Sequence, residues 1–179
     1  MLAILSPAKT LDYQTPLTTK KSSQADFNRE SSELMSTLRK FAPADIASLM
    51  KISDKLAELN HRRYAEWRPQ ADEDNARPAL FAFKGDVYQG LDASSMSARD
   101  INFAQKHLRV LSGLHGLLRP LDLIQPYRLE MGTRLVTKRG GNLYEFWGTK
   151  VTDSINQALA QQSSNCLLYT SPSPRDRSS

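Results

Sequence analysis

The residues of this chain that are best suited to chemistry are basic side chains in short loops close to glycines. Between residues 105 and 140, seven Lys and Arg stand against two acidic residues, and this net charge of +5 equals that of the whole chain. Lysine and arginine neutralise phosphate, and glycine lets backbone N–H groups approach it closely. The concentration of charge therefore predicts a site for phosphate, a nucleotide or nucleic acid.

Three loops that each follow an apolar segment supply most of this candidate site, at residues 6–12, 84–88 and 112–120. If the apolar segments are parallel neighbours, the loops share the carboxyl edge of one sheet, where open α/β sheets bind ligands. The predicted DNA- or phosphate-binding residues are Lys9, Lys84, Arg119, Arg128, Arg134, Gly113 and Gly116, and the predicted supporting residues are Asp86, Tyr88 and Glu130.

The glycine motif at residues 111–116, Leu-Ser-Gly-Leu-His-Gly, allows a second interpretation. It lacks the Gly-Lys-Ser/Thr ending of a P-loop and the third glycine of a dinucleotide fingerprint. A glycine turn between two helices, however, can present backbone amides to a DNA phosphate without reading bases. This interpretation places the motif in a helix–hairpin–helix arrangement.

Catalytic residues cannot be assigned from the sequence. Cys166 is the only cysteine, no Ser/His/Asp arrangement is present, and the three histidines lack metal-ligand spacing. We therefore predict no metal and no cofactor. Asp86 and Glu130 could form an acid/base pair, but ion pairs with Lys84 or Arg128 are the alternative use of these carboxylates.

Hydrophobic patterning predicts the elements that must position these residues. The predicted strands cover residues 2–5, 79–83 and 108–111. The predicted helices cover residues 24–40, a short helix from Pro43, a helix from Ser53 to Trp67, a helix from Ser97 to His107, and a helix from Asn142 to Leu159. This order predicts an α/β fold, a single domain with short strands in a mixed sheet flanked by helices, with a positively charged cleft.

Length and composition fit one domain, since the chain has 179 residues of which 40% are hydrophobic. No stretch approaches the roughly 20 apolar residues that span a bilayer, so we predict no membrane partner. The first residues, Met1 to Ser6, lack the basic region of a signal peptide. A cytoplasmic location is the resulting prediction.

The end of the chain differs in composition from the rest. After Cys166 to Tyr169, which could imitate the start of a strand, the chain continues in Ser, Pro and Arg of low complexity. We therefore predict a domain at residues 1–164, truncated at its C-terminus, and a non-native or disordered tail at residues 165–179.

Several motifs in the same order resemble the YaaA peroxide-stress-resistance family. They are ILSPAKTLDYQTPL from residue 4, LMKISDKLAELN from 49, FKGDVYQGL from 83, HLRVLSGLHGLLRPLDLIQPYRLEMGT from 107 and LYEFWG from 143. The resemblance implies a cytosolic bacterial protein that limits hydroperoxide and other oxidative damage by keeping free iron low. It also implies binding of duplex DNA in a positively charged cleft. The family's motif positions correspond to Lys9, Lys84, Asp86, Tyr88, Arg119, Arg128 and Glu130, with no catalytic role attached.

Two functions remain open from the sequence. The first, which we favour, is a non-enzymatic stress protein that binds duplex DNA or another phosphate-bearing ligand through the basic segment. The alternative is an enzyme acting on a nucleotide or phosphate ester, with Lys84 and Arg128 holding phosphate and Asp86 or Glu130 as the base.

Overall fold

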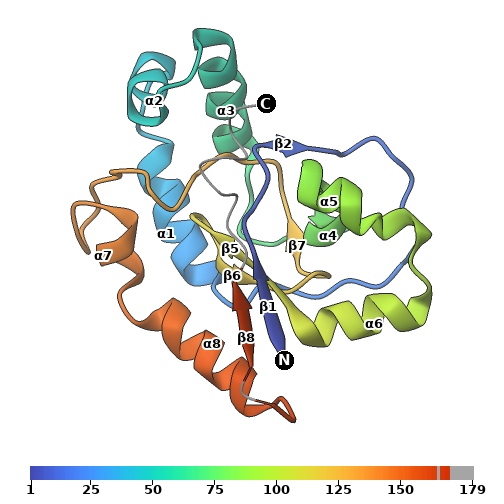
Figure 1. Ribbon diagram of the computed structural model, residues 1–179. Helices are drawn as coiled ribbons and strands as arrows, with labels where there is room; N and C mark the ends of the chain where they lie inside the picture. Colours follow the sequence, from blue (N-terminus) through green and yellow to red (C-terminus); the bar gives the residue numbers. More distant parts are fainter. Residues whose placement is uncertain (165, 170–179) are drawn as a thin grey trace.

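A four-stranded mixed sheet forms the centre of the fold, in the order β6-β5-β1-β8. The computed structural model in Figure 1 describes residues 1–164 and 166–169. β1 (Leu2–Leu5) pairs in parallel with β5 (Leu108–Ser112) and β8 (Leu167–Tyr169), whereas β6 (Gly116–Leu118) runs antiparallel to β5. The predicted α/β class with a mixed sheet is confirmed.

Two short antiparallel ladders lie outside the central sheet. β2 (Thr10–Leu11) pairs with β4 (Phe83–Lys84), and β3 (Arg77–Pro78) pairs with β7 (Leu123–Ile124). The first ladder joins the segment after β1 to the segment around Lys84. Two of the three predicted site loops are thereby held together, although not at the edge of one parallel sheet.

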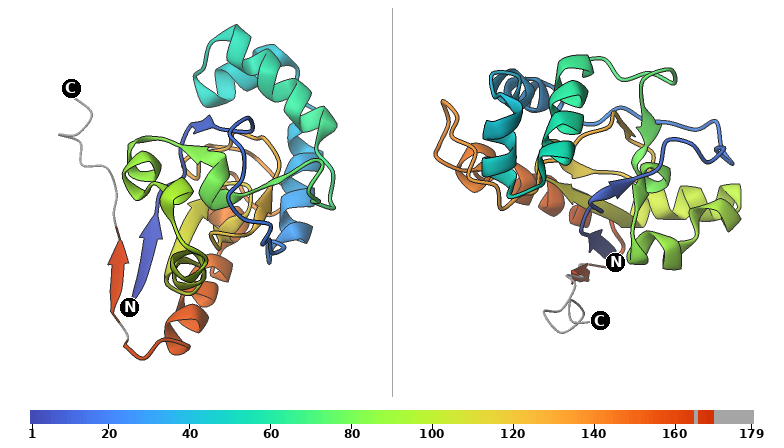
Figure 2. Two further views of the ribbon diagram at one scale, coloured as in Figure 1. Left: turned by 90° about the vertical axis from the view of Figure 1, so that its right-hand side faces the viewer. Right: turned by 90° about the horizontal axis from the view of Figure 1, so that it is seen from above.

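Helices cover both sides of the central sheet. α1 (Asn28–Leu38), α7 (Leu143–Trp147) and α8 (Lys150–Ala160) lie on one side. α4 (Ala79–Ala82), α5 (Asp86–Leu91) and α6 (Ala98–His107) lie on the other, with the 3-10 turn η1 (Ala93–Ser95) between the last two. α2 (Pro43–Met50) and α3 (Asp54–Glu66) pack on each other and project from one end of the molecule, as Figure 2 shows.

Local sequence signals explain several of the helix starts. The Ser97 side chain accepts a hydrogen bond from the Asp100 amide, and the Asp100 carboxylate accepts one from the Ser97 amide, which completes the predicted capping box. The Asn142 side chain caps α7 by accepting a hydrogen bond from the Glu145 amide, while the Glu145 carboxylate accepts from the Gly141 amide instead of the Asn142 backbone amide. Pro43 occupies the first turn of α2, where its missing N–H is not needed. These predicted helix starts are confirmed.

The predicted strand at residues 79–83 is wrong. Ala79–Ala82 form the short helix α4, and only Phe83 continues into a strand, β4. A short apolar run cannot distinguish a buried strand from a buried helix, and the two alanines favour the helix. The amides of Ala79 and Leu80 donate to the carbonyls of Asp122 and Pro120, so this helix is fixed to the 119–122 turn.

The continuous helix predicted from Asn142 to Leu159 is also wrong, because the chain forms two helices there. Gly148 ends α7 with a φ of +52°, a positive value that favours glycine and interrupts the helical path. α8 then begins at Lys150. Trp147, the last residue of α7, is buried and packs edge-to-face on Phe27 and on Phe146, as expected of a core aromatic residue.

Candidate phosphate-binding site

Lys9, Arg128 and Glu130 line one cavity, of about 650 Å³, between the end of β1 and the segment 127–132. The Glu130 Oε1 atom lies 3.0 Å from Arg128 Nη2 and 3.8 Å from Lys9 Nζ. One carboxylate thus stands between two cations that are far apart in the sequence. We call this opening the Lys9–Arg128 cavity.

Gly113 allows the walls of the Lys9–Arg128 cavity to meet. A Cβ atom at this position would lie 2.3 Å from the Leu129 carbonyl oxygen, so no side chain fits between the β5–β6 turn and the segment 127–132. The Gly113 carbonyl also accepts a hydrogen bond of 3.0 Å from the Trp147 indole. The glycine is therefore required for close approach of two backbones.

Three buried tyrosines make hydrogen bonds at this site, two of them to backbone carbonyls and one to a side-chain hydroxyl. Tyr88 donates to the Ser6 carbonyl at 2.8 Å, and Tyr64 donates to the Arg128 carbonyl. The Tyr127 hydroxyl lies 2.6 Å from the Ser112 hydroxyl, at the start of the β5–β6 turn. Burial raises the pKa of all three tyrosines, so these hydroxyls stay protonated and available as donors.

Arg128 is largely buried and incompletely paired. Its side chain is 16% exposed, and its Nε atom is buried without a hydrogen-bond partner among the described residues. Glu130 and Lys9 are 50% and 68% exposed. Ion pairs with such exposed groups contribute about 0–1 kcal/mol, so an incoming anion can displace Glu130 at little cost. A phosphate that reached Arg128 would gain a partly desolvated guanidinium.

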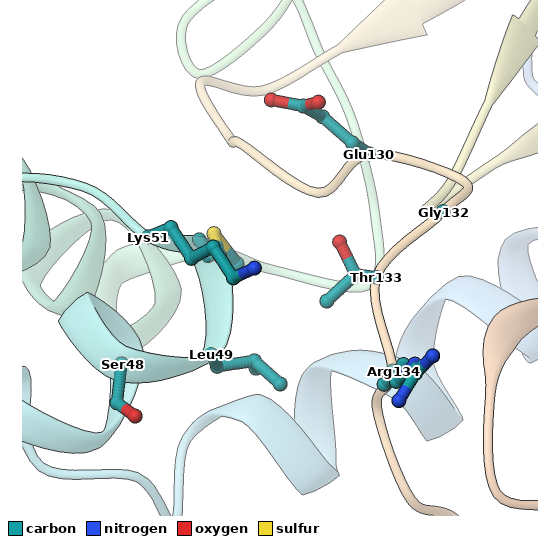
Figure 3. A pocket seen from close by; sticks show the side chains of 8 residues that line it. Ser48, Leu49, Lys51, Glu130, Gly132, Thr133 and Arg134 are labelled. Carbon is teal, nitrogen blue, oxygen red and sulfur yellow. The ribbon is translucent and has the colours of Figure 1, made fainter.

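A second cavity, of about 610 Å³, adjoins the first and shares Glu130 and Gly132 with it. Lys51, at the end of α2, lines one side, and Thr133 and Arg134 line the other, as Figure 3 shows. We call it the Lys51–Arg134 cavity. Among the described residues, the charged groups that line the two cavities together are four basic side chains and one carboxylate.

Lys84 lines neither cavity, although its neighbour Phe83 lines the first one. The Lys84 Nζ atom is 3.6 Å from the Asp12 carboxylate, and the β2–β4 ladder places Lys84 opposite Thr10. Hydrogen bonds from the Thr15 and Gln14 amides lower the pKa of Asp12, so the carboxylate is ionised at neutral pH. Asp86 is exposed in the first turn of α5 and also lines neither cavity.

Arg119 is separate from both cavities and is neutralised locally. Its guanidinium lies 3.0 Å from the buried Asp122 carboxylate and 3.1 Å from Asp26, and it donates to the Gln24 carbonyl at 2.6 Å. Burial raises the pKa of Asp122, while hydrogen bonds from Arg119 and Ser23 act in the opposite direction. This arrangement joins the segment before α1 to the 119–122 turn.

The helix–hairpin–helix interpretation of the glycine motif is wrong, because strands β5 and β6 flank the turn. Gly116 adopts a φ of +68°, and a Cβ atom there would lie 2.9 Å from the Trp147 ring. Gly116 therefore packs against a core aromatic side chain. Of the two glycines, only Gly113 lines one of the two cavities described above.

His115 lies in the core beneath the site. Its Nδ1 atom is 3.1 Å from the Ser31 hydroxyl, its ring packs edge-to-face on Tyr127, and its Nε2 atom has no partner within the described part of the chain. Burial lowers the pKa of His115 to about 3, so the ring is neutral at physiological pH. No local pattern in the sequence indicates this burial.

Lys51 and Thr133 were missed by sequence analysis. Lys51 belongs to the motif LMKISDKLAELN, but nothing local indicates that it faces a segment far later in the chain. No group of three or more His, Cys, Asp or Glu that could hold a metal occurs in residues 1–164 and 166–169. In that same part of the chain, no helix is long and apolar enough to cross a bilayer.

The structure thus defines an α/β domain with two adjoining cavities whose charged lining is mainly basic. The chain belongs to the family whose model is described as peroxide stress protein YaaA, which matches residues 1–171. The resemblance seen in the sequence motifs is therefore confirmed.

Relatives of the chain include UPF0246 proteins from several bacteria. One from Tolumonas auensis is 60% identical over 168 residues, and one from Aliivibrio fischeri is 58% identical over 168 residues. A UPF0246 protein from Janthinobacterium sp. (strain Marseille) is 57% identical. Each alignment covers 94% of this chain and 65% of the relative, so the chain spans just under two thirds of their length.

The expected boundary at residue 164 stays a prediction. The family match continues to residue 171, and Leu167–Tyr169 form the edge strand β8, which lies parallel to β1. Residue 165 and residues 170–179, on which most of the predicted tail falls, lie outside the described residues.

Proposed function

We propose that this protein acts in the peroxide stress response and binds duplex DNA in the Lys9–Arg128 cavity. The family assignment supports the peroxide-stress context. The observation that carries the DNA proposal is the meeting of Lys9 and Arg128 at a single half-exposed carboxylate. A DNA phosphate entering this cavity replaces Glu130 as the partner of both cations.

The geometry favours phosphate contacts over base readout. Lys9 is an exposed cation on a long flexible side chain, and Arg128 offers a guanidinium that can hold two phosphate oxygens at once. Contacts of this kind position a protein on DNA without reading its sequence. We therefore expect binding that depends strongly on salt and little on base sequence.

Fluorescence anisotropy with a labelled duplex tests this proposal. Affinity should fall steeply between about 50 and 200 mM salt. In a plot of the logarithm of the binding constant against the logarithm of the salt concentration, each phosphate held should contribute a slope of roughly −1. Lys9→Ala and Arg128→Ala should each weaken binding equally for unrelated sequences. Lys20→Ala, on an exposed segment that lines neither cavity, is the matched control. Salt-independent binding, or no binding, would contradict the proposal.

Lowering of free iron is the cellular part of the proposal. DNA bound by the protein is then protected indirectly, because less iron remains to react with peroxide. Whole-cell measurement of chelatable iron after a peroxide challenge tests this in a strain that lacks the gene. Restoration by the wild-type gene but not by an Arg128→Ala gene would connect the cavity to iron. Equal restoration by both would separate the two activities.

An enzyme acting on a nucleotide or phosphate ester is the second candidate, favoured by the position of Glu130. Among the described residues, Glu130 is the only carboxylate that lines the Lys9–Arg128 cavity, so it replaces Asp86 as the candidate base. Thermal shift with a panel of nucleotides distinguishes the candidates. A large stabilisation by one nucleotide would favour the enzyme, whereas uniformly small shifts would favour DNA binding.

A further inference from the structure

The Lys51–Arg134 cavity contains two basic groups that form no ion pair with the described part of the chain. Neither the Lys51 ammonium nor the Arg134 guanidinium makes a hydrogen bond or ion pair with any residue in the described ranges 1–164 and 166–169. This differs from the first cavity, where Glu130 pairs with both cations. Figure 3 shows the Thr133 side chain between the two basic residues, on the same side of the opening as Arg134.

Lys51 also has a backbone conformation that favours another residue. It ends α2 in the left-handed region, with φ of +53° and ψ of +53°, where glycine is the usual residue and a lysine is strained. The only other non-glycine residue with positive φ among the described residues is Asp92, a type that tolerates this region. The presence of a lysine at residue 51 is therefore an independent sign that its side chain is used.

The rim between the two cavities is formed by the two residues that they share, Gly132 and Glu130. Gly132 has no side chain, and a Cβ atom at this position would have no neighbour within 4 Å among the residues that the structure describes. The other shared residue, Glu130, places its carboxylate on the first cavity's cations. A ligand with one phosphate can satisfy one set of cations, whereas a ligand with repeated phosphates can cross the rim and satisfy both.

We propose that Lys51, Thr133 and Arg134 form a second phosphate subsite, which holds another phosphate of the same nucleic-acid strand as the Lys9–Arg128 cavity. This inference rests on the proposed function. Lys51 and Arg134 supply the charge, and the Thr133 hydroxyl supplies a neutral donor. Phosphates recur along each strand of duplex DNA at about 3.4 Å of helix axis, so a strand held in the first cavity carries further phosphates that can enter the adjoining one.

Lys51→Gly is the most informative variant because it removes the cation and the backbone strain together. If Lys51 only caps α2 through the negative end of the helix dipole, its loss changes stability but not binding. If the subsite exists, the variant keeps its melting temperature within a few degrees and binds DNA several-fold more weakly. The salt slope should also fall by about one unit, which corresponds to one lost phosphate contact.

The experiment compares the wild-type 179-residue chain, Lys51→Gly, Arg134→Gln and the control Lys20→Gly by anisotropy with one duplex over a series of salt concentrations. We expect both subsite variants to bind DNA more weakly than the wild type and with a smaller salt dependence. Lys20→Gly should match the wild type in both. If the wild type binds DNA and the subsite variants keep its slope, the subsite is wrong and the DNA proposal stands. If Lys20→Gly loses as much affinity and salt dependence as the two subsite variants, the effect comes from the net charge of the chain, and the subsite is also wrong.

Two further outcomes are decisive. A wild-type chain that does not bind DNA overturns the proposed function and the subsite with it. Competition with inorganic pyrophosphate identifies the ligand class. If micromolar pyrophosphate displaces DNA from the wild type but not from Lys51→Gly, a diphosphate occupies both cavities and the nucleic-acid assignment is wrong. Displacement only at high ionic strength supports it.

Discussion

Arg119 and Arg128 both belong to the basic segment at residues 105–140, but the structure gives them different surroundings. Arg119 pairs with Asp122, whose side chain is fully buried, and with Asp26. Arg128 pairs with Glu130, whose side chain is half exposed, and keeps its buried Nε atom unpaired within the described residues. We propose that the burial of the partner carboxylate makes the difference: Asp122 keeps Arg119 as part of the fold, whereas a ligand can displace Glu130 from Arg128.

The largest test of this comparison is the removal of each carboxylate. Asp122→Ala should lower the free energy of unfolding by about 3 kcal/mol, because Arg119, its backbone amide and Ser23 lose a buried partner. Glu130→Ala, the matched variant at the exposed pair, should cost under about 1 kcal/mol. Urea denaturation of both variants measures the difference. Equal losses would show that the two arginines are not distinct in kind.

A smaller effect is expected from the neutral histidine beneath the site. The folded-state pKa of His115 is lowered to about 3, whereas the unfolded value is near 6.5, so between these values only the unfolded chain binds the proton. The free energy of unfolding should therefore fall by about 1.4 kcal/mol per pH unit below 6.5, or about 2 kcal/mol at pH 5. His115→Gln should remove this part of the pH dependence, and urea denaturation at pH 7 and pH 5 would reveal it. An unchanged pH dependence in the variant would mean that His115 titrates normally in the folded chain.

Local signals in the sequence were sufficient for the helix starts but not for the site. Ser97 and Asp100 lie three residues apart, so their capping box is readable without a fold. Charge in the sequence indicates the phosphate-binding candidates, but it does not distinguish Arg119, with a buried partner, from Arg128. That distinction depends on which residues meet Asp122 and Glu130 in space.

Long-range adjacency explains the rest of what sequence analysis missed. The Tyr64 hydroxyl reaches the Arg128 carbonyl across 64 residues, and Lys51 faces Arg134 across one cavity. Neither adjacency leaves a periodic signal. The helix at residues 79–82 was missed because burial of most of its side chains removes the alternation that would separate helix from strand.

The smallest effect on stability, and the sharpest on binding, is expected for Glu130→Gln. The substitution keeps the size of the side chain and one acceptor oxygen, so the free energy of unfolding should change by less than about 1 kcal/mol. Lys9 and Arg128 would lose the Glu130 carboxylate as their partner, so a phosphate would no longer compete with that carboxylate for the two cations. DNA affinity at moderate salt should therefore rise several-fold, as measured by anisotropy, whereas Asp122→Asn should leave the affinity of the folded protein unchanged. A weaker Glu130→Gln complex would instead make Glu130 a direct ligand contact, which is the role that the enzymatic alternative requires of it.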